Sequence, residues 1–308
     1  ISLPEMKKYG YDDEFACGVI ASGGVLGILI PPSVGFILFG LLTDQSIGTL
    51  YIAGILPGIL LMGLFFVTAY ILSTIRSQRS GLPATTTSLR EKLLSLKGLI
   101  DVIVIFLVVV GGLFLGYFSP TEAGAVGAFA VLIASIVRRN FSWKKFFVSL
   151  QRATTMVGMI ILVFVGAMIF NYFLSASMLP FKVGKIISSL PLSPIYIVSA
   201  ILILWIILGA IMDEIAMIIL TVPILYPIIL ELGLDPIWFC VLGVISIEAG
   251  LISPPIGMNL NIIKGVASDV PMSTIFRGVM PFFCAILVLM ALVLFIPQIA
   301  LYLPSVLR

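Results

Sequence analysis

Histidine is absent from the 308 residues, and charged residues make up only 10% of them. Without histidine the chain lacks the usual general base and the commonest ligand of transition metals, which argues against a membrane metalloprotease. Cysteine is nearly as scarce, and Cys17, Cys240 and Cys284 lie in apolar stretches without metal-type spacing. We therefore expect neither a disulfide framework nor a zinc site, and we interpret all three cysteines as core residues.

Apolar residues, in contrast, make up 61% of the chain, which is too many for a water-soluble core surrounded by a polar surface. The composition predicts an integral membrane protein whose surroundings are a lipid bilayer. The long apolar runs lack the alternation of an outer-membrane barrel, so we expect an all-α fold. The predicted membrane segments are 18–43, 50–75, 99–118, 122–138, 154–177, 195–212, 214–231, 236–267 and 278–303.

Basic residues are concentrated in two loops. The loop from Arg76 to Lys97 holds five basic residues and one acidic residue, Glu91, and the loop from Arg138 to Arg152 holds five basic residues and no acidic one. Such clusters beside membrane segments indicate cytoplasmic loops. A nucleic-acid-binding patch is the rival interpretation, but the position of both clusters next to apolar segments favours cytoplasmic loops. We therefore expect no nucleic-acid partner.

Part of the sequence is duplicated. Seven residues recur at a separation of 223 positions, namely Pro4/Pro227, Gly10/Gly233, Asp12/Asp235, Cys17/Cys240, Gly27/Gly250, Pro31/Pro254 and Pro32/Pro255. Duplicated hydrophobic segments interrupted by proline are typical of secondary transporters.

Each copy carries a Pro-Pro pair inside an apolar run, Gly27–Ser33 in one and Gly250–Ile256 in the other. Proline has no N–H and its ring clashes with the preceding turn, so each pair frees carbonyls that a continuous helix would use. Free carbonyls in a dry cavity suit a hard cation, and Ser33, Ser253 and Asn259 add oxygen ligands. The alternative is that each pair only kinks a packed helix.

The two copies are predicted to have opposite orientations. With both basic loops inside, segment 18–43 runs outward and segment 236–267 runs inward, which also places Lys264 and Arg277 on the cytoplasmic side. We therefore expect an inverted repeat.

The predicted domains follow from this repeat. They are the C-terminal part of the first repeat, a cytoplasmic linker with an interfacial helix over Arg90–Leu99, and the second repeat, in the order 1–75, 76–98 and 99–308. About 125 residues of the second repeat precede Pro227 and only three precede Pro4, so we expect the first repeat to be incomplete in this chain.

Asp213 lies between two strongly apolar runs, far from any basic cluster. Carboxylates within a membrane are costly and are functional by default, so Asp213 either binds a cation or caps the helix that follows. Glu214 is its neighbour and does not share its helix face. For Glu248 two interpretations stay open, a site residue or a solvated helix end.

Three further segments have mainly structural interpretations. Ser119–Gly124 predicts a helix start with Ser119 as N-cap and Pro120 at the first position. Met178–Leu190 predicts an interfacial helix, and Trp143 predicts an anchor at the membrane surface.

Four ordered motifs resemble the large membrane subunit of TRAP transporters, the DctM type. They are Leu26–Ser33, Ser119–Gly124, Met212–Asp213 followed by Leu220–Pro227, and Gly250–Asn259. The resemblance covers essentially all 308 residues. It departs from the family at the front, where the family has further helices and a first hairpin tip, and this puts the first ion site in doubt.

The resemblance implies a function and a set of partners. In this family a periplasmic solute-binding protein delivers an organic anion to a small and a large membrane subunit in the cytoplasmic membrane of bacteria or archaea. Transport is usually coupled to Na⁺, and a transport domain with re-entrant hairpins and discontinuous helices moves as an elevator. The family's sodium sites map onto Gly27, Pro31, Pro32, Ser33, Asp213, Ser253, Pro254, Pro255 and Asn259.

The sequence thus supports the hypothesis of a sodium-coupled, inverted-repeat secondary transporter subunit that imports a small organic anion. A passive channel or structural membrane subunit is the first alternative. A membrane-embedded hydrolase is the second, with Asp213 and Glu248 as the only plausible pair of carboxylates.

Overall fold

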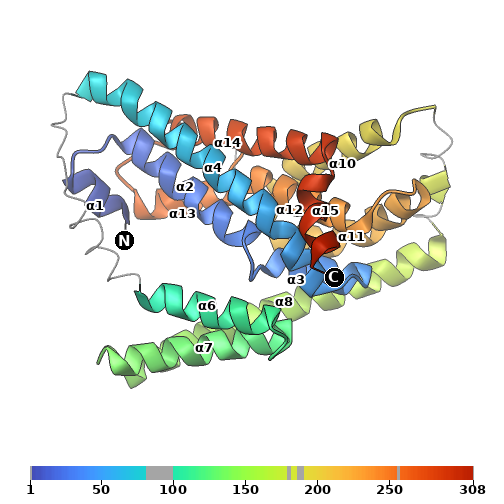
Figure 1. The fold of residues 1–308 in the computed structure, drawn as a ribbon, viewed down its shortest axis with the longest axis horizontal. Helices are drawn as coiled ribbons and strands as arrows, with labels where there is room; N and C mark the ends of the chain where they lie inside the picture. The colour runs from blue at the N-terminus through green and yellow to red at the C-terminus, as the bar shows by residue number, and fades with distance from the viewer. Residues whose placement is uncertain (1, 81–99, 179–181, 186–190, 255–256, 308) are drawn as a thin grey trace. The chain divides into compact units, whose positions relative to one another are not determined.

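The structure is a computed structural model that describes residues 2–80, 100–178, 182–185, 191–254 and 257–307. In these ranges the regular elements are helices. Packing divides the chain into two compact units, residues 82–163 and the remainder, each of which is described separately (Figure 1). This division follows packing density and does not test the repeat boundaries predicted from the sequence.

The larger unit contains both Pro-Pro segments. Helix α8 (Trp143–Ser177) contributes only its last part, from Phe164 onward. The other helices are α1 (Ser2–Lys8), α2 (Asp13–Leu29), α3 (Val34–Thr43), α4 (Ile47–Ser80), α10 (Pro194–Gly209), α11 (Glu214–Glu231), α12 (Pro236–Leu251), α13 (Met258–Val266), α14 (Met272–Phe295) and α15 (Gln298–Val306).

Every predicted membrane segment is occupied by helix, and 214–231 coincides with α11. Among the described residues, five stretches are long and apolar enough to cross a membrane, which fits an integral membrane protein: Asp13–Thr43, Ile47–Ile75, Trp143–Leu174, Glu214–Glu231 and Met272–Phe295.

Two predicted membrane segments differ in extent from the helices that occupy them. Helix α8 begins at Trp143 and not near residue 154, because its basic first turns are good helix formers and continue directly into the apolar part. The predicted segment 278–303 is divided into α14 and α15 at Ile296 and Pro297, where proline cannot donate the next helical hydrogen bond.

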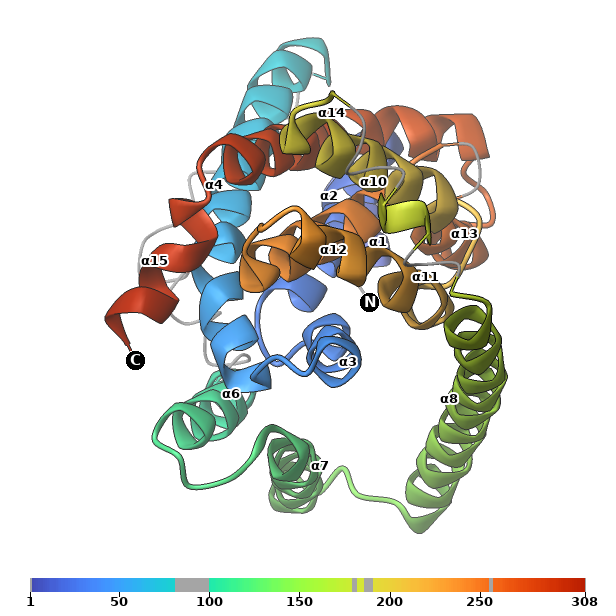
Figure 2. The same cartoon turned by 90° about the vertical axis from the view of Figure 1, so that its right-hand side faces the viewer.

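Helix α12 lies at the centre of the larger unit. Figure 2 shows it surrounded by α4, α10, α11 and α14, and it also contacts α2, α3, α13 and α15. All of its residues from Ile237 to Leu251 are buried. The neighbours of α12 thus enclose it on every side, including its polar residues Ser246 and Glu248.

Three aromatic rings join α3, α10 and α12. The ring of Trp205 packs edge-on against Phe39, with 5.9 Å between centroids, and lies 5.1 Å from the ring of Phe239. The indole N–H of Trp205 donates to Thr221 Oγ1 over 2.8 Å, so its polar atom is satisfied. Through this cluster α3, the second half of the first interrupted helix, packs against α10 and α12 of the second repeat.

Glycines permit two close helix crossings. A Cβ on Gly250 of α12 would lie 2.8 Å from Gly209 Cα and 2.9 Å from Ile206 O of α10. A Cβ on Gly278 of α14 would overlap the carbonyl oxygen of Glu14 in α2. Both helix pairs pack backbone to backbone, a contact that membrane helices use because lipid gives them no hydrophobic reason to associate.

The smaller unit consists of α6 (Ile100–Phe114), α7 (Pro120–Val137) and the first part of α8, up to Val163. Asp101 of α6 forms an ion pair with Arg138, the C-cap residue of α7. The predicted helix start is confirmed: Glu122 N–H donates to Ser119 Oγ over 3.3 Å, and Ser119 N–H donates to Glu122 Oε2 over 2.7 Å. This reciprocal pair is a capping box.

Removing this cap has a measurable cost. Ser119→Ala should lower the free energy of unfolding by about 1 kcal/mol, because the N–H of Glu122 loses its acceptor. The midpoint of thermal unfolding in detergent micelles measures the change. Ser119→Asn retains a capping oxygen and should unfold close to the wild type; equal loss in both variants would contradict the cap as the cause.

The residues around Trp143 form an aromatic cluster at the start of α8. The ring of Trp143 packs on Phe141, Phe146 and Phe147, with centroids 5.2 to 6.1 Å apart, and it is exposed. This arrangement agrees with an anchor at a membrane surface.

Three other predictions have different outcomes. In the predicted interfacial helix Met178–Leu190, residues 182–185 are helical and most of the remainder lies outside the described residues. The predicted helix over Arg90–Leu99 lies wholly outside them. The core prediction holds for Cys17 and Cys240 but was wrong for Cys284, which is exposed on α14. Lipid is as apolar as a core, so apolar surroundings in the sequence do not predict burial in a membrane protein.

Candidate functional site

The first Pro-Pro pair interrupts a helix, as predicted. Helix α2 ends at Leu29, Ile30 is extended, and α3 begins after Ser33. Pro31 and Pro32, joined by a cis peptide bond, cannot donate to the carbonyls of Gly27 and Ile28 one turn earlier. The break therefore exposes carbonyl oxygens at the end of α2 and N–H groups at the start of α3.

Ser33 organises the start of α3. It is 2% exposed, and its Oγ accepts from the N–H of Phe36 over 3.4 Å. Its carbonyl oxygen accepts from the hydroxyl of Tyr51 in α4, also over 3.4 Å. Tyr51 is 1% exposed, so a buried hydroxyl from a third helix holds this turn in place.

The second Pro-Pro pair interrupts a helix in the same way. Helix α12 ends at Leu251, and α13 begins after Gly257. Both the N–H and the Oγ–H of Ser253 donate to Gly250 O, over 3.0 and 2.9 Å. Pro254 is exposed in the turn, and Pro255 lies outside the described residues.

Gly257 is required by the geometry of this second turn. Its φ is +41°, a conformation that favours glycine. A Cβ there would lie 2.9 Å from Ser253 O and 3.1 Å from Leu251 O. The carbonyl oxygens of Ser253 and Leu251 thus leave no room for a side chain at position 257.

Positions 223 residues apart have matching conformations. Gly10 and Gly233 both have a positive φ, +77° and +68°. Asp12 and Asp235 are the N-cap residues of α2 and α12, with nearly equal backbone angles. The duplicated residues therefore build the same helix entry twice, each followed by a Pro-Pro break.

Asp213 is the N-cap of α11. Its Oδ2 accepts from the N–H of Ile215 over 3.1 Å, and the residue is partly exposed. The capping role predicted for Asp213 is confirmed, and its accessible carboxylate leaves the cation role as a prediction. Asn259 lies in the first turn of α13 and is also partly exposed.

The fold brings several predicted site residues together. A Cβ on Gly35 in the first turn of α3 would lie 2.7 Å from Glu214 Oε1 and 3.6 Å from Ser33 Oγ. The start of α11, with Asp213, therefore lies against the first break. The Gly209–Gly250 crossing places the end of α10 beside the end of α12, close to the second break.

The predicted site residues differ in exposure. Pro31, Ser33 and Ser253 are buried, whereas Gly27 and Pro32 are exposed with Pro254. A Cβ on Gly27 would meet nothing within 4 Å. In this chain Gly27 therefore has open space where its counterpart Gly250 is covered by α10.

The role of Glu248 was left ambiguous by the sequence. Its side chain is 1% exposed, so the interpretation as a solvated helix end is wrong. Neither Oε1 nor Oε2 has a hydrogen-bond partner among the described residues. A buried carboxyl group without a partner requires a physical cause.

Sequence reasoning missed the positions of Tyr51 and Glu214. Glu214 was set aside because it does not share a helix face with Asp213, but its carboxylate lies against a different helix, α3. Tyr51 is one apolar residue among many in its segment. The sequence indicates only that a buried hydroxyl or carboxyl group needs a hydrogen-bond partner, and it does not identify the partner.

The possible ligands at the two breaks are oxygen atoms. They are carbonyl, hydroxyl and amide oxygens, with the carboxylates of Asp213 and Glu214 near the first break. Among the described residues no group of three or more His, Cys, Asp or Glu side chains is close enough to bind a metal. Hard oxygen ligands of low total charge are compatible with a monovalent cation.

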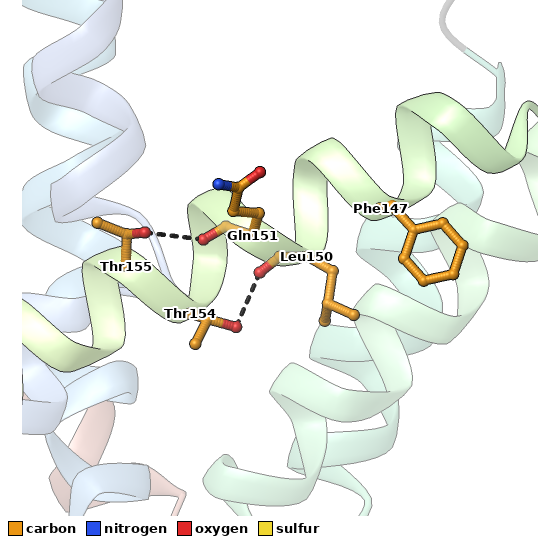
Figure 3. A pocket seen from close by; sticks show the side chains of 5 residues that line it. All are labelled: Phe147, Leu150, Gln151, Thr154 and Thr155. Atoms are coloured by element: carbon orange, nitrogen blue, oxygen red, sulfur yellow. Dashed lines mark hydrogen bonds between the residues drawn. The ribbon is translucent and has the colours of Figure 1, made fainter.

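A hollow on α8 is distinct from this site. It is lined by one face of the helix, from Phe147 and Leu150 to Thr155 (Figure 3). The hydroxyls of Thr154 and Thr155 donate to the carbonyls of Leu150 and Gln151, over 2.9 and 3.0 Å. Both hydroxyl protons are therefore used within the helix itself.

An ion-pair cluster joins the two copies outside the apolar spans. Lys7 Nζ lies 2.6 Å from Asp269 Oδ2 and 3.1 Å from Asp13 Oδ1. The hydrogen bond to Asp269 raises the pKa of Lys7, and the same bond lowers the pKa of Asp269. The beginning of α2 thus lies beside the loop that follows α13.

These features define a helical, multi-pass membrane protein in which two matching helices, α2–α3 and α12–α13, are each interrupted at a Pro-Pro pair. Residues 1–299 match the family described as tripartite ATP-independent periplasmic transporter, DctM component. The chain belongs to this family of TRAP transporter large permeases.

Curated relatives extend the comparison. The chain is 33% identical over 307 residues to the C4-dicarboxylate TRAP transporter large permease protein DctM of Pseudomonas aeruginosa, covering 99% of this chain and 71% of the relative. It is 29% identical over 306 residues to the sialic acid TRAP transporter large permease protein SiaM of Vibrio cholerae, with the same coverage. It is 31% identical over 299 residues to the 2,3-diketo-L-gulonate TRAP transporter large permease protein YiaN of Escherichia coli, covering 96% and 69%. All three are transport proteins by name.

Proposed function

We propose that this chain is the membrane-embedded transport subunit of a sodium-coupled system that imports a small organic anion. The observation that carries the proposal is the pair of matching helix breaks, each at a Pro-Pro pair with a buried serine beside it. Such breaks are tolerated within a membrane only where protein or a cavity surrounds them. In secondary transporters they form ion and substrate sites.

The relative direction of the two interrupted helices supports an inverted repeat. The Lys7–Asp269 ion pair places the beginning of α2 next to the chain that leaves α13. The first interrupted helix therefore starts where the second one ends. This is the arrangement that the distribution of basic loops predicts, and inverted repeats are common in secondary transporters. We propose that it belongs to an elevator-type transport domain.

The proposed sodium ligands fall into two groups. The first group lies at the first break, close to the start of α11 with Asp213, and consists of Gly27, Pro31, Pro32 and Ser33. The second break contributes Ser253, Pro254, Pro255 and Asn259. In each group backbone oxygens supply most of the donors, and Asp213 supplies a negative charge that balances the cation.

An organic anion is the proposed substrate. The relatives named above carry substrates that share a carboxylate group. The N-termini of α3, α11 and α13 begin at or beside the two breaks, and their partial positive charge favours an anion. The proposed partners are a small TRAP membrane subunit and a periplasmic solute-binding protein, in a bacterial or archaeal cytoplasmic membrane.

Replacing sodium with potassium tests the coupling. The transporter is reconstituted in vesicles with its small subunit, and uptake of the labelled ligand of its binding protein is followed. We expect uptake to stop when sodium is absent outside, because the cation sites must fill before the anion is bound. Unchanged uptake in potassium would contradict the coupling and favour a passive channel.

A further inference from the structure

Glu248 lies in the last turn of the central helix α12, three residues before it ends. Its side chain is 1% exposed, and both carboxylate oxygens lack a hydrogen-bond partner among the described residues. None of the proposed sodium positions includes it. The proposed function therefore gives this buried carboxyl group no role.

The face of α12 that carries Glu248 points towards α3 and α11. Val244, one turn earlier on the same face, lies 3.4 Å from the position of a Cβ on Gly35, and Glu214 Oε1 lies 2.7 Å from that position. Glu214 is therefore the acidic residue that faces this side of α12 from the start of α11. A second acidic group, and not a basic one, thus lies closest to the buried carboxyl.

The other elements packed on α12 supply no compensating charge. Helices α3 and α10 contain no charged residue, and the hydroxyl of Tyr51 on α4 is already bonded to Ser33. Helices α2, α13 and α14 carry Asp13, Glu14, Lys264 and Arg277, and the ammonium group of Lys264 donates to the carbonyls of Ser268 and Val270. Among the described residues, then, no cation neutralises Glu248.

Three physical effects oppose a negative charge at this position. An unpaired carboxylate in an apolar interior loses its hydration without compensation. Glu214 repels it. The C-terminal end of α12 adds the partial negative charge of its free carbonyls. A bound proton removes the negative charge on which all three effects act, and it leaves only the smaller cost of burying a neutral carboxyl group.

We propose that Glu248 is a proton-binding site, occupied at neutral pH while α3, α11 and α12 are packed as in this structure. The ligand is a single proton. It comes from water and returns to water when α3, α11 and α12 separate. The site is separate from the proposed sodium positions and does not depend on sodium coupling.

Infrared spectroscopy of the purified protein in lipid nanodiscs tests this inference. A protonated carboxyl gives a C=O stretching band that shifts in D₂O, whereas a carboxylate does not. At neutral pH we expect one such band to be lost in Glu248→Gln and retained in Glu5→Gln, which alters an exposed glutamate on α1. Identical spectra of wild type and Glu248→Gln in this region would overturn the proposal.

Two further measurements control for misfolding and for sodium binding at Glu248. Glu248→Leu provides a second neutral side chain of similar size, so that a folding failure of one variant leaves the band testable in the other. Spectra recorded in sodium and in potassium should be alike. If sodium removed the band, the carboxyl would bind sodium in place of the proton, and the proposal would be wrong.

Discussion

Asp213→Asn should reduce sodium-driven uptake by about tenfold or more, because a charged ligand contributes about 1.5–3 kcal/mol to an interaction. The stability should change little, since asparagine caps a helix about as well as aspartate and can still accept from the N–H of Ile215. Uptake at limiting sodium in reconstituted vesicles and thermal unfolding in micelles measure the two effects.

Two other variants separate the charge of Asp213 from its capping role. Asp213→Ala should lose uptake and also about 1 kcal/mol of stability, because the cap is removed. Asp235→Asn is the matched control: Asp235 caps α12 by accepting from Trp238 N–H over 3.0 Å, at the end of the helix away from the break. Its uptake should match the wild type. Normal sodium dependence in Asp213→Asn would show that Asp213 is only a cap.

Gly250→Ala should lower the free energy of unfolding by about 1–3 kcal/mol, the typical cost of overpacking. The added Cβ would lie 2.8 Å from Gly209 Cα and 2.9 Å from Ile206 O, and both of these atoms belong to backbone. The helices α10 and α12 must therefore separate, which weakens the packing around the central helix. Thermal unfolding in detergent micelles gives the shift in midpoint.

The duplication supplies the control for this experiment. Gly27 occupies the equivalent position in the first copy, and a Cβ there would meet nothing within 4 Å. Gly27→Ala should leave the free energy of unfolding unchanged or raise it by up to about 1 kcal/mol. Alanine gives the unfolded chain less conformational freedom than glycine does, so less entropy is lost on folding. Equal destabilisation by both substitutions would mean that the α10–α12 contact does not cause the effect at Gly250.

Local signals in the sequence predicted much of the fold. The Pro-Pro pairs marked both helix breaks, because a proline acts on its own turn whatever surrounds it. Ser119 with Glu122, and Asp213, marked helix starts for the same reason. Within the described residues the apolar runs located the membrane helices, but they did not predict the start of α8 at Trp143 or the break between α14 and α15.

Contacts between distant segments could not be predicted in this way. Apolar patterning gave no information on which faces are buried, since lipid and protein interior are equally apolar, and Cys284 was therefore misplaced. The contact of Glu214 with α3 joins residues far apart in the chain. So does the hydrogen bond from Tyr51 to Ser33, which crosses from α4 to the first break.

By itself the sequence determined that this is a helical membrane protein with a duplicated, proline-interrupted helix, because composition and proline chemistry act locally. Only the tertiary structure decided that Glu214 lies against the first break and that Glu248 is enclosed at the centre without a partner among the described residues. The physical reason is that burial, and with it the cost of an unpaired charge, depends on what the other helices cover.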